Sequence, residues 1–597
     1  MSDTIRRLGI LIGLALLTVG LSPNARGQSW TSTATKAYPV QYLSNATFVG
    51  SLDPSTPLHI VVGLQEQNAD QIQPTLQRMI TPGDPLYGTS FTLDQFVAQF
   101  GPTPAQVQAV QNYLSGSGFT NITVADNQLL IEADGTAATV TNAFNTVLAN
   151  YSVNGATVYV NTADAQVPAS LGGVVIAVLG LNNVVSVHFD SHTLALNTSP
   201  STDPCSPPNC PTPAIANEVF GPQQYQIAYD AVCPPDNPHC PAQNFTPGSA
   251  TAVGIIVEGD LTQVIKDLRT YEQTYKLPQV PVTVVNAGIQ SPDTSGAEEW
   301  DLDSQVSTGI AQQVSHLYFY AATTLTDSDL ALAINKAVSQ NRVKAFNMSF
   351  GECEIVPYID GAMLIDDQIF GEAALHGMTP FAASDDNGSA CPVEGVTNGV
   401  PLTGPPDTSY PASSPYVIAV GGTNLFTNAD FTYDFETGWE ASGGGPSYFE
   451  NPPFWQAYTG SGTLPIVPSS EGSAVGAGRG VPDVSMCAGG TVLAICSANV
   501  FVSGTATLIG GTSLSSPLAM GAWARIQTAH RNKLGFAGPL IYQLANGGPA
   551  PTSPVFNDVL LGSNGLFTAL PGYDYVTGLG SWDIYRIYKL IPSVYPQ

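Results

Sequence analysis

Apolar runs of strand length alternate with helical patterns between residues 252 and 383, and this alternation restricts the possible folds. Strands joined through helices favour a largely parallel sheet with right-handed crossovers. The active sites of such sheets lie at the carboxyl ends of strands, and Asp385 and Asp386 follow one such predicted end. The predicted strands are 252–257, 282–285, 316–320, 343–348 and 379–383, and the predicted helices are 261–275, one beginning near 295, 327–340 and 359–376.

A smaller α+β unit is predicted before this sheet. Thr103 and Pro104 provide an N-cap and a first-turn proline for its first helix. The order β-α-β-β-α-β predicts a ferredoxin-like arrangement. Its strands are predicted at 59–64, 122–124, 129–133 and 174–179, and its helices at 104–114 and 136–148. Residues 196–219 are rich in proline and poor in apolar side chains, which predicts a linker to a second unit at 220–597.

The first 27 residues have the pattern of a secretory signal peptide. Arg6 and Arg7 precede an apolar run at 8–21, and Ala25-Arg26-Gly27 offers small residues at the cleavage spacing. An uncleaved anchor is the alternative, which the shortness of the run disfavours. We therefore predict secretion to the extracellular space, with no membrane association after the signal is removed.

The charge balance is strongly acidic. The chain has 17 Lys and Arg against 46 Asp and Glu, a net charge of −29, which disfavours nucleic acid as a partner. Charged residues make up 11% of the sequence. A surface with so few ion pairs loses little stability when carboxylates become protonated, and this fits an acidic working environment.

Eight cysteines follow the signal peptide, and an even number in a secreted protein predicts disulfides. Their spacings are poor matches to zinc sites. Sequence alone does not determine the pairing, and our hypothesis is that neighbours pair: Cys205–Cys210, Cys233–Cys240, Cys353–Cys391 and Cys487–Cys496.

Ser513 lies at a junction between glycines and a predicted helix, in the stretch 510–517. Small neighbours allow a substrate backbone to approach, and the first N–H groups of a helix are unpaired and suit a developing oxyanion. A plain N-cap serine is the alternative for this pattern taken alone.

A carboxylate pair offers the base that a serine nucleophile needs. Ser295 and Glu298 have capping-box spacing, so we predict a helix start there. Glu299 and Asp303 then lie one turn apart on one face, where two close carboxylates tend to share a proton. An acidic helix N-terminus is the alternative. No histidine has a recognisable catalytic context; the seven are His59, His188, His192, His239, His316, His376 and His530.

The Glu-x-x-x-Asp helix, followed far along the chain by Gly511-Thr512-Ser513, resembles the sedolisin family of serine-carboxyl peptidases. The resemblance spans residues 57–582 and implies a subtilisin-like fold with a Glu-Asp-Ser triad. It implies that Ser513 is the nucleophile, Glu299 the base and Asp303 its orienting partner. Residues 28–195 resemble the kumamolisin-like activation propeptide of the family, which assists folding and blocks the cleft. An independent α+β binding module is the alternative for this unit.

The turn at 384–388 is similar to the family turn that carries an aspartate in the oxyanion hole, and this role falls on Asp386. A carboxyl group stabilises a negative oxygen only while protonated, because only then does it donate a hydrogen bond. Asp385 replaces the usual glycine, and aspartate tolerates positive φ better than most residues. Without the resemblance, the turn would be interpreted as an Asx-turn. Asp483 is a further acidic candidate in the chain, and we interpret its role as structural.

The segment 556–580 resembles the calcium loop of the same family. Calcium prefers several oxygen ligands from carboxylates and carbonyls. The resemblance implies side-chain ligands from Asp558 and Asp574 and carbonyl ligands from Val559, Leu570 and Gly572, although the family usually has glycine at the Leu570 position. Without the resemblance, these are turn aspartates.

Together these features predict a secreted, calcium-binding, acid-acting endopeptidase that is made as a zymogen. Its partners would be protein and peptide substrates and its own propeptide as an intramolecular inhibitor, and we expect a monomer. A histidine-based subtilisin-like protease is one alternative. A catalytically inactive binding protein on a protease scaffold is the other.

Overall fold

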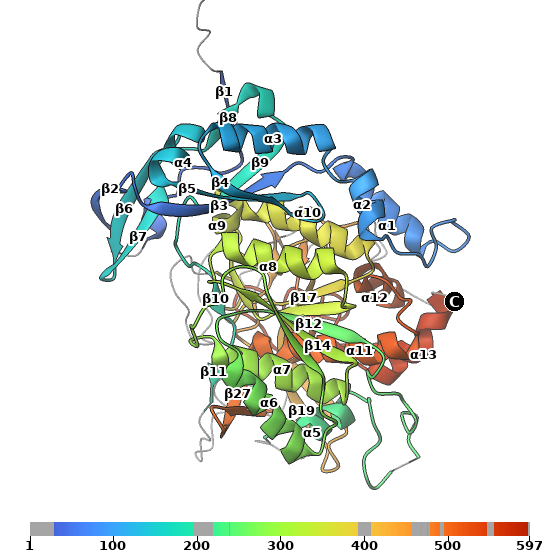
Figure 1. The fold of residues 1–597 in the computed structure, drawn as a ribbon. Coiled ribbons are helices and arrows are strands. Elements are labelled where there is room, and N and C mark those ends of the chain that lie inside the picture. Colours follow the sequence, from blue (N-terminus) through green and yellow to red (C-terminus); the bar gives the residue numbers. More distant parts are fainter. Residues whose placement is uncertain are drawn as a thin grey trace, which may run out of the picture.

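The fold was analysed in a computed structural model, and Figure 1 shows a smaller N-terminal unit packed on a larger α/β unit. The predicted signal peptide, the pair Cys205–Cys210 and nearly all of the predicted linker lie outside the described residues. The structure describes residues 29–43, 45–194, 219–237, 239–391, 407–456, 467–468, 474–475, 478–489, 495–545 and 555–594.

The N-terminal unit has the predicted order of strands and helices around a four-stranded antiparallel sheet, β4-β5-β3-β9. Helix α3 begins with a capping box, in which Thr103 Oγ1 accepts from the Gln106 N–H and the Gln106 side chain accepts from the Thr103 N–H. The elements are β3 (Pro57–Leu64), α3 (Pro104–Gly116), β4 (Thr120–Val124), β5 (Leu130–Thr136), α4 (Ala137–Ala143) and β9 (Val175–Leu179).

Alternation along β3 explains how this unit attaches to the larger one. Ile60 and Val62 belong to a core shared with α3 and α4, whereas Val61 belongs to the main core together with Ile365. A Cβ on Gly63 would lie 2.5 Å from the Ile365 side chain, so the glycine permits the close approach of α10 (Ala362–Leu375).

The larger unit is built on a ten-stranded sheet in the order β13-β14-β12-β15-β17-β19-β25-β29-β28, with β20 paired to β19. The strands from β13 through β25 pair in parallel, as the alternation predicted. They are β12 (Ala252–Glu258), β13 (Val282–Asn286), β14 (His316–Ala322), β15 (Ala345–Met348), β17 (Thr379–Ala383), β19 (Ile418–Thr427) and β25 (Val484–Cys487), followed at the edge by β20 (Tyr433–Gly438), β28 (Phe556–Asn557) and β29 (Ser581–Trp582).

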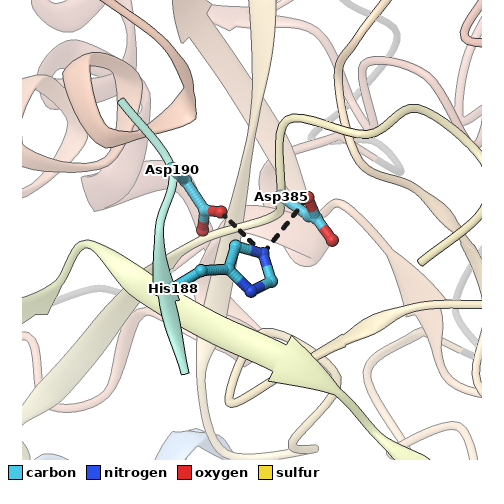
Figure 2. Close-up of side chains that lie close together, drawn as sticks. All are labelled: His188, Asp190 and Asp385. Atoms are coloured by element: carbon cyan, nitrogen blue, oxygen red, sulfur yellow. Dashed lines mark ion pairs between the residues drawn. The ribbon is translucent and has the colours of Figure 1, made fainter. Parts of the chain in front are cut away.

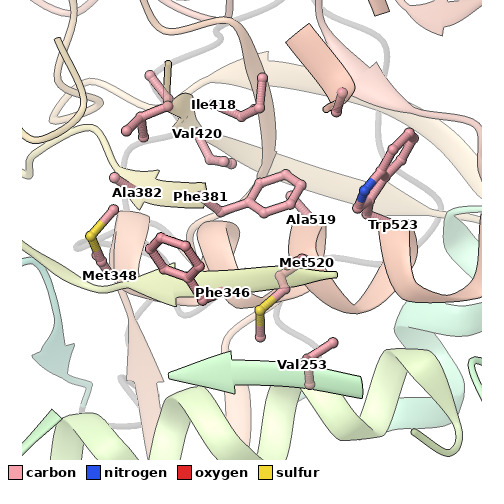
Figure 3. Close-up of a cluster of buried hydrophobic side chains, with 14 of the residues drawn as sticks. Val253, Phe346, Met348, Phe381, Ala382, Ile418, Val420, Ala519, Met520 and Trp523 are labelled. Carbon is pink, nitrogen blue, oxygen red and sulfur yellow. The ribbon is translucent and has the colours of Figure 1, made fainter. Parts of the chain in front are cut away.

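Helices cover both faces of this sheet. Figure 1 shows α8 and α10 between the sheet and the N-terminal unit, and α6 and α7 on the opposite side. The helices are α6 (Thr262–Tyr275), α7 (Ala297–Ala311), α8 (Asp327–Gln340) and α11 (Thr512–Ala529). Helix α11 packs on the sheet through buried side chains that include Ala519, Met520 and Trp523, beside Phe346 and Phe381 of the strands (Figure 3). Burial stabilises each large side chain by about 1.5–3 kcal/mol, so the position of α11 is firmly fixed.

Three predicted element boundaries are wrong. The helix predicted at 136–148 ends at Ala143, because Asn145 adopts a positive φ of 43° and the chain turns toward the next strand. The helix predicted at 359–376 is two helices, α9 (Ile355–Asp360) and α10, divided at Gly361. A Cβ on Gly361 would lie 2.6 Å from that of Ala177 in β9.

The predicted cap of α7 is also different. The helix begins after Gly296 without a side-chain cap, and the Ser295 N–H donates instead to Asp293 Oδ1. Glu298 accepts a hydrogen bond from Thr193 rather than completing a capping box.

Three predicted disulfides are confirmed: Cys233–Cys240, Cys353–Cys391 and Cys487–Cys496. In the described part of the chain, every helix is too short or too polar to cross a lipid bilayer.

Asp483 has the structural role that the sequence suggested. Its carboxylate pairs with Arg479 at 2.6 Å and accepts from the Tyr542 hydroxyl at 2.8 Å and the Ala419 N–H at 2.8 Å. Both partners of the ion pair are 1% exposed, so removal of one leaves an uncompensated buried charge.

We predict that Asp483→Ala lowers the free energy of unfolding by about 3–5 kcal/mol, the usual cost of breaking a buried pair. The measurement is urea unfolding followed by tryptophan fluorescence. Asp583→Ala is the control, because its partner Arg586 is 39% exposed and such pairs contribute about 1 kcal/mol or less. Equal effects of the two substitutions would contradict this account.

Candidate active site

Ser513 is the second residue of α11 and is completely buried. The strand β27 (Thr505–Gly510) leads to Gly511, whose φ is +118°, and then directly into the helix. A Cβ on Gly511 would lie 2.2 Å from the carbonyl oxygen of Asp190 and 2.5 Å from Asp386 Oδ2, so only glycine fits. The Ser513 N–H, which has no partner within the helix, donates to the Asp190 carbonyl at 2.9 Å.

Glu299 and Asp303 lie one turn apart on α7 and are 2% and 0% exposed. Burial, with the nearby charge of Asp303, raises the pKa of Glu299 well above its usual range. The hydroxyls of Ser191 and Ser513 are close enough to oppose this rise in pKa, although neither Glu299 oxygen has a hydrogen bond of ordinary geometry. Burial also raises the pKa of Asp303, to about 8, against hydrogen bonds from Ser349 and Asn347.

A polar network at the end of β15 connects Asp303 to Ser513, and the sequence analysis missed its members. Ser349 Oγ donates to Asp303 Oδ1 at 2.6 Å, and Asn347 Nδ2 donates to Ser349 Oγ at 2.8 Å. The Ser513 hydroxyl donates to the Ser349 carbonyl at 3.3 Å. The available signal was the polar pair Asn347 and Ser349 at the carboxyl end of an otherwise apolar strand.

Asp386 follows β17 and faces the start of α11. Its Oδ1 accepts from the N–H and the hydroxyl of Thr512 at 2.8 and 2.9 Å. Its Oδ2 is buried without a hydrogen bond and lies beside Gly511, as the Asp190 carbonyl oxygen does. Burial raises the pKa of Asp386, against His192 and Thr512.

Residues 187–194, at the end of the N-terminal unit, cross this site, and we call them the tail. The strand β10 (His188–Phe189) pairs with β16 (Phe350–Cys353), and β11 (His192–Thr193) pairs with β27. His192 Nδ1 lies 3.4 Å from Asp386 Oδ2, and its ring stacks on Trp439. The sequence analysis gave neither His188 nor His192 a place at the site, because no local pattern encodes pairing with strands so distant in the chain.

The four predicted catalytic residues thus lie together at the start of α11, with Asp386 bonded to Thr512, Glu299 near the Ser513 hydroxyl and Asp303 linked to Ser513 through Ser349. Among the described residues, no histidine is hydrogen bonded to Ser513, whereas Glu299 lies within reach of its hydroxyl.

The predicted calcium ligands lie on one loop. Asp558 accepts from the Gly572 N–H at 3.1 Å, and Asp574 Oδ2 accepts from the Leu570 N–H at 2.9 Å, so both carboxylates meet the segment 570–572. Burial raises the pKa of Asp574 to about 6, and no ion pair within the described ranges involves either carboxylate. Asp574 is buried, Asp558 is half-buried, and Leu570 and Gly572 are exposed. Oxygen-rich and without a cationic partner among the described residues, this donor set fits a hard divalent cation at the surface.

Comparisons with known proteins agree with this geometry. The pro-kumamolisin activation domain matches residues 44–184, and the subtilase family matches residues 287–539. Sedolisin from Pseudomonas sp. (strain 101) is 36% identical over 598 residues, covering 94% of this chain and 92% of that protein. The chain is a member of the sedolisin family.

Two further comparisons are consistent with sedolisin membership. Xanthomonalisin from Xanthomonas sp. (strain T-22) is 37% identical over 90% of this chain and 66% of its own length. A structure of Pseudomonas sedolisin, a serine-carboxyl proteinase complexed with two molecules of pseudo-iodotyrostatin, shares 34% identity with a TM-score of 0.55. It covers 63% of this chain and 99% of that one. The chain is therefore a serine-type peptidase with an activation domain, and the predicted fold class is confirmed.

The raised pKa of Asp303 predicts how stability depends on pH. In the unfolded chain the pKa of an aspartate is about 3.9, so the folded state binds this proton more tightly than the unfolded state does. The resulting stabilisation is complete below about pH 4 and is lost as the pH rises through about 8. We expect Asp303→Asn to make the melting temperature of the full-length protein less dependent on pH across this window. The exposed Asp70→Asn is the control, and an unchanged slope in Asp303→Asn would contradict the assignment.

Proposed function

We propose that this sedolisin is a secreted endopeptidase that is made as a zymogen and works at acidic pH through Ser513, Glu299, Asp303 and Asp386. The observation that carries the proposal is that the four residues meet at the start of α11: Asp386 accepts from Thr512, Glu299 lies near the Ser513 hydroxyl, and Ser349 links Asp303 to Ser513. The domain limits at residues 27, 195 and 219 remain part of the proposal.

The four residues divide the chemistry of peptide hydrolysis among them. Ser513 Oγ attacks the carbonyl carbon while Glu299 takes its proton and later returns it to the leaving amine. Asp303, held by Ser349, orients Glu299 and shares its proton. The Ser513 N–H and protonated Asp386 Oδ2 donate to the oxyanion, and such donors contribute about 3–4 kcal/mol each to the transition state.

The carboxyl environment sets the working pH. Asp386 must keep its proton to donate, whereas the Glu299–Asp303 pair must lose one proton to accept another, which gives a bell-shaped profile. Burial beneath the tail raises the pKa values of these groups, with desolvation as the largest cause. When the tail leaves, water enters and the pKa values return toward those of ordinary carboxylic acids. The active enzyme should therefore work on the acid side of neutrality.

We also propose that calcium is held by Asp558 and Asp574 with the carbonyls of Val559, Leu570 and Gly572. The ion would neutralise two partly desolvated carboxylates and hold the loop between them. The support is the fit of the donor set described above, and the ion would act on stability rather than on the chemical step.

Casein digestion tests the catalytic assignment. We predict that the processed wild type has maximal activity at acidic pH, that Ser513→Ala is inactive and remains full length, and that Glu299→Gln lowers kcat by about 10²–10⁴-fold. Glu298→Gln, on the same turn but bonded to Thr193, is the matched control and should keep near-normal kcat.

The histidine-based alternative would be favoured by an activity maximum at pH 8 or above. It would also be favoured if substitution of a single histidine abolished activity while Glu299→Gln stayed active. A wild type that digests nothing at any pH would favour the inactive binding protein.

Chelation tests the calcium site by a readout independent of activity. We predict that EDTA lowers the melting temperature of Ser513→Ala and that added calcium restores it, because a ligand at one hundred times its Kd stabilises by about 2.7 kcal/mol. Asp574→Asn should have the lower melting temperature already and respond little to EDTA. The exposed Asp434→Asn is the control and should respond as the parent does. An EDTA effect that persists unchanged in Asp574→Asn would place the ion elsewhere.

A further inference from the structure

The tail lies in the site as an extended chain with a strand on each side. His188 and Phe189 are in register with Gly351 and Phe350, and His192 and Thr193 are in register with Gly510 and Ile509. Both pairings are antiparallel, so backbone hydrogen bonds fix the chain before and after a central gap. The two residues in this gap are Asp190 and Ser191.

The peptide bond between these two residues lies among the predicted catalytic groups. The Asp190 carbonyl accepts from the Ser513 N–H at 2.9 Å, and both this oxygen and Asp386 Oδ2, which His192 approaches at 3.4 Å, lie beside Gly511. On the other side of the bond, the Ser191 side chain lies within reach of Glu299, which also reaches the Ser513 hydroxyl. Nucleophile, base and oxyanion donors therefore surround one bond of the protein's own chain.

We propose that Asp190–Ser191 is the first bond that the zymogen cleaves, with Asp385 holding the tail in register by its contact with His188. The inference rests on the proposed function and adds the bond and the residue that selects it. Ser513 Oγ would form an ester with the Asp190 carbonyl carbon, and the Ser191 nitrogen would leave as an amine with the proton from Glu299. Water would then hydrolyse the ester, releasing a carboxyl group on Asp190 and restoring Ser513.

The contact that sets the register joins His188, Asp190 and Asp385, as Figure 2 shows. In an extended chain, residues two apart face the same side, so His188 and Asp190 point together toward the turn after β17. His188 Nε2 lies 3.4 Å from Asp190 Oδ1 and 3.7 Å from Asp385 Oδ1. The His188 side chain is 13% exposed and the two carboxylates are nearly inaccessible, so this contact is shielded from solvent.

The charges of the cluster suit an acidic solution. Burial by itself lowers the pKa of His188, but Asp385, Asp190 and the Ser186 backbone outweigh it and raise the value to about 9. Burial raises the pKa of Asp190, and the carboxylates of Asp385 and Asp386 add to this rise, against the charge of His188, which lowers it. In acid, a cationic His188 therefore lies beside Asp385 while Asp190 is neutral. Asp385 is thus placed to select a cationic side chain at the third residue on the N-terminal side of the cleaved bond.

The same three side chains have ligand atoms within 4.8 Å of one another and could hold a metal ion. Two of the three belong to the tail, so such a site would exist only before processing. The cluster is therefore better explained as recognition of the tail.

The decisive experiment follows the purified full-length protein after a shift from neutral to acidic pH. Intact mass and N-terminal sequencing at early times should find a fragment that ends at Asp190 and a new N-terminus at Ser191. Ser513→Ala should give neither product. Ser191→Pro removes the N–H of the leaving group and should slow this cleavage at least about tenfold, with circular dichroism to establish that the variant is folded.

Two histidine variants test the register. His188→Ala should slow cleavage at Asp190–Ser191 by about tenfold or shift it to another bond. His59→Ala is the matched control, since His59 also pairs with a carboxylate, Asp134 at 2.7 Å, but lies on β3 outside the tail, and it should process normally. For the processed enzyme, a peptide of sequence His-Phe-Asp-Ser-His-Thr should be cleaved faster than its Ala-Phe-Asp-Ser-His-Thr analogue. Asp385→Asn should remove that preference.

The outcomes separate this inference from the proposed function. The inference would be overturned if the earliest new N-terminus were not Ser191, or if Ser191→Pro were processed at the normal rate. In either case, digestion of casein by the wild type at acidic pH would still support the proposed function. Equal cleavage of the two peptides by wild type would remove the role of Asp385. Absence of both processing and casein digestion would reject the function itself.

Discussion

The burial of carboxyl groups without cationic partners is the constraint on which the rest of this structure depends. A chain with 46 acidic and 17 basic residues cannot supply a cation to each buried acid. An unpaired buried carboxylate is too costly to keep ionised, so such a group holds its proton instead. Glu299 and Asp303 are in this condition, and Asp386 is approached by the His192 ring at 3.4 Å. Each of the three has a raised pKa for which burial is the largest cause. Burial makes each of these groups costly to ionise at neutral pH. The retained proton lets Asp386 act as a hydrogen-bond donor and lets Glu299 and Asp303 share one proton.

The tail lies against these acidic groups. It adds a short strand to β16 and another to β27, and its central residues cover Ser513 and Glu299. Strand addition of this kind depends on backbone hydrogen bonds, so it holds almost any sequence in place and leaves selectivity to the side chains. The zymogen is therefore closed by the type of interaction that a substrate would make. Inhibition and recognition become two consequences of one binding geometry.

The sequence predicted the features that are encoded locally. The alternation of strands and helices, the N-cap at Thr103 and three disulfides between consecutive cysteines are all present. The cap at Ser295 was wrong because Asp293 offered its N–H a closer acceptor, and the long helix through Gly361 was wrong because β9 packs against that point. The crossing of the tail could not be predicted, since its pairing partners lie far along the chain. For Ser349 the sequence offered only its place at the end of an apolar strand, and its contact with Asp303 forms only when β15 and α7 are brought together.

Asp385 shows how one substitution in a family pattern can serve two purposes. Its φ of 99° lies where glycine is usual, and aspartate is among the side chains that tolerate positive φ best. Its Oδ1 accepts from the Asp386 N–H, and its carbonyl accepts from the Gly443 N–H at 2.7 Å, so the side chain and the backbone both hold the turn. A glycine would provide the backbone bond but not the first one. The carboxylate that steadies Asp386 is also the one that His188 approaches. The position of the oxyanion donor and the recognition of the tail are thus coupled through a single residue, and a change at Asp385 must disturb both.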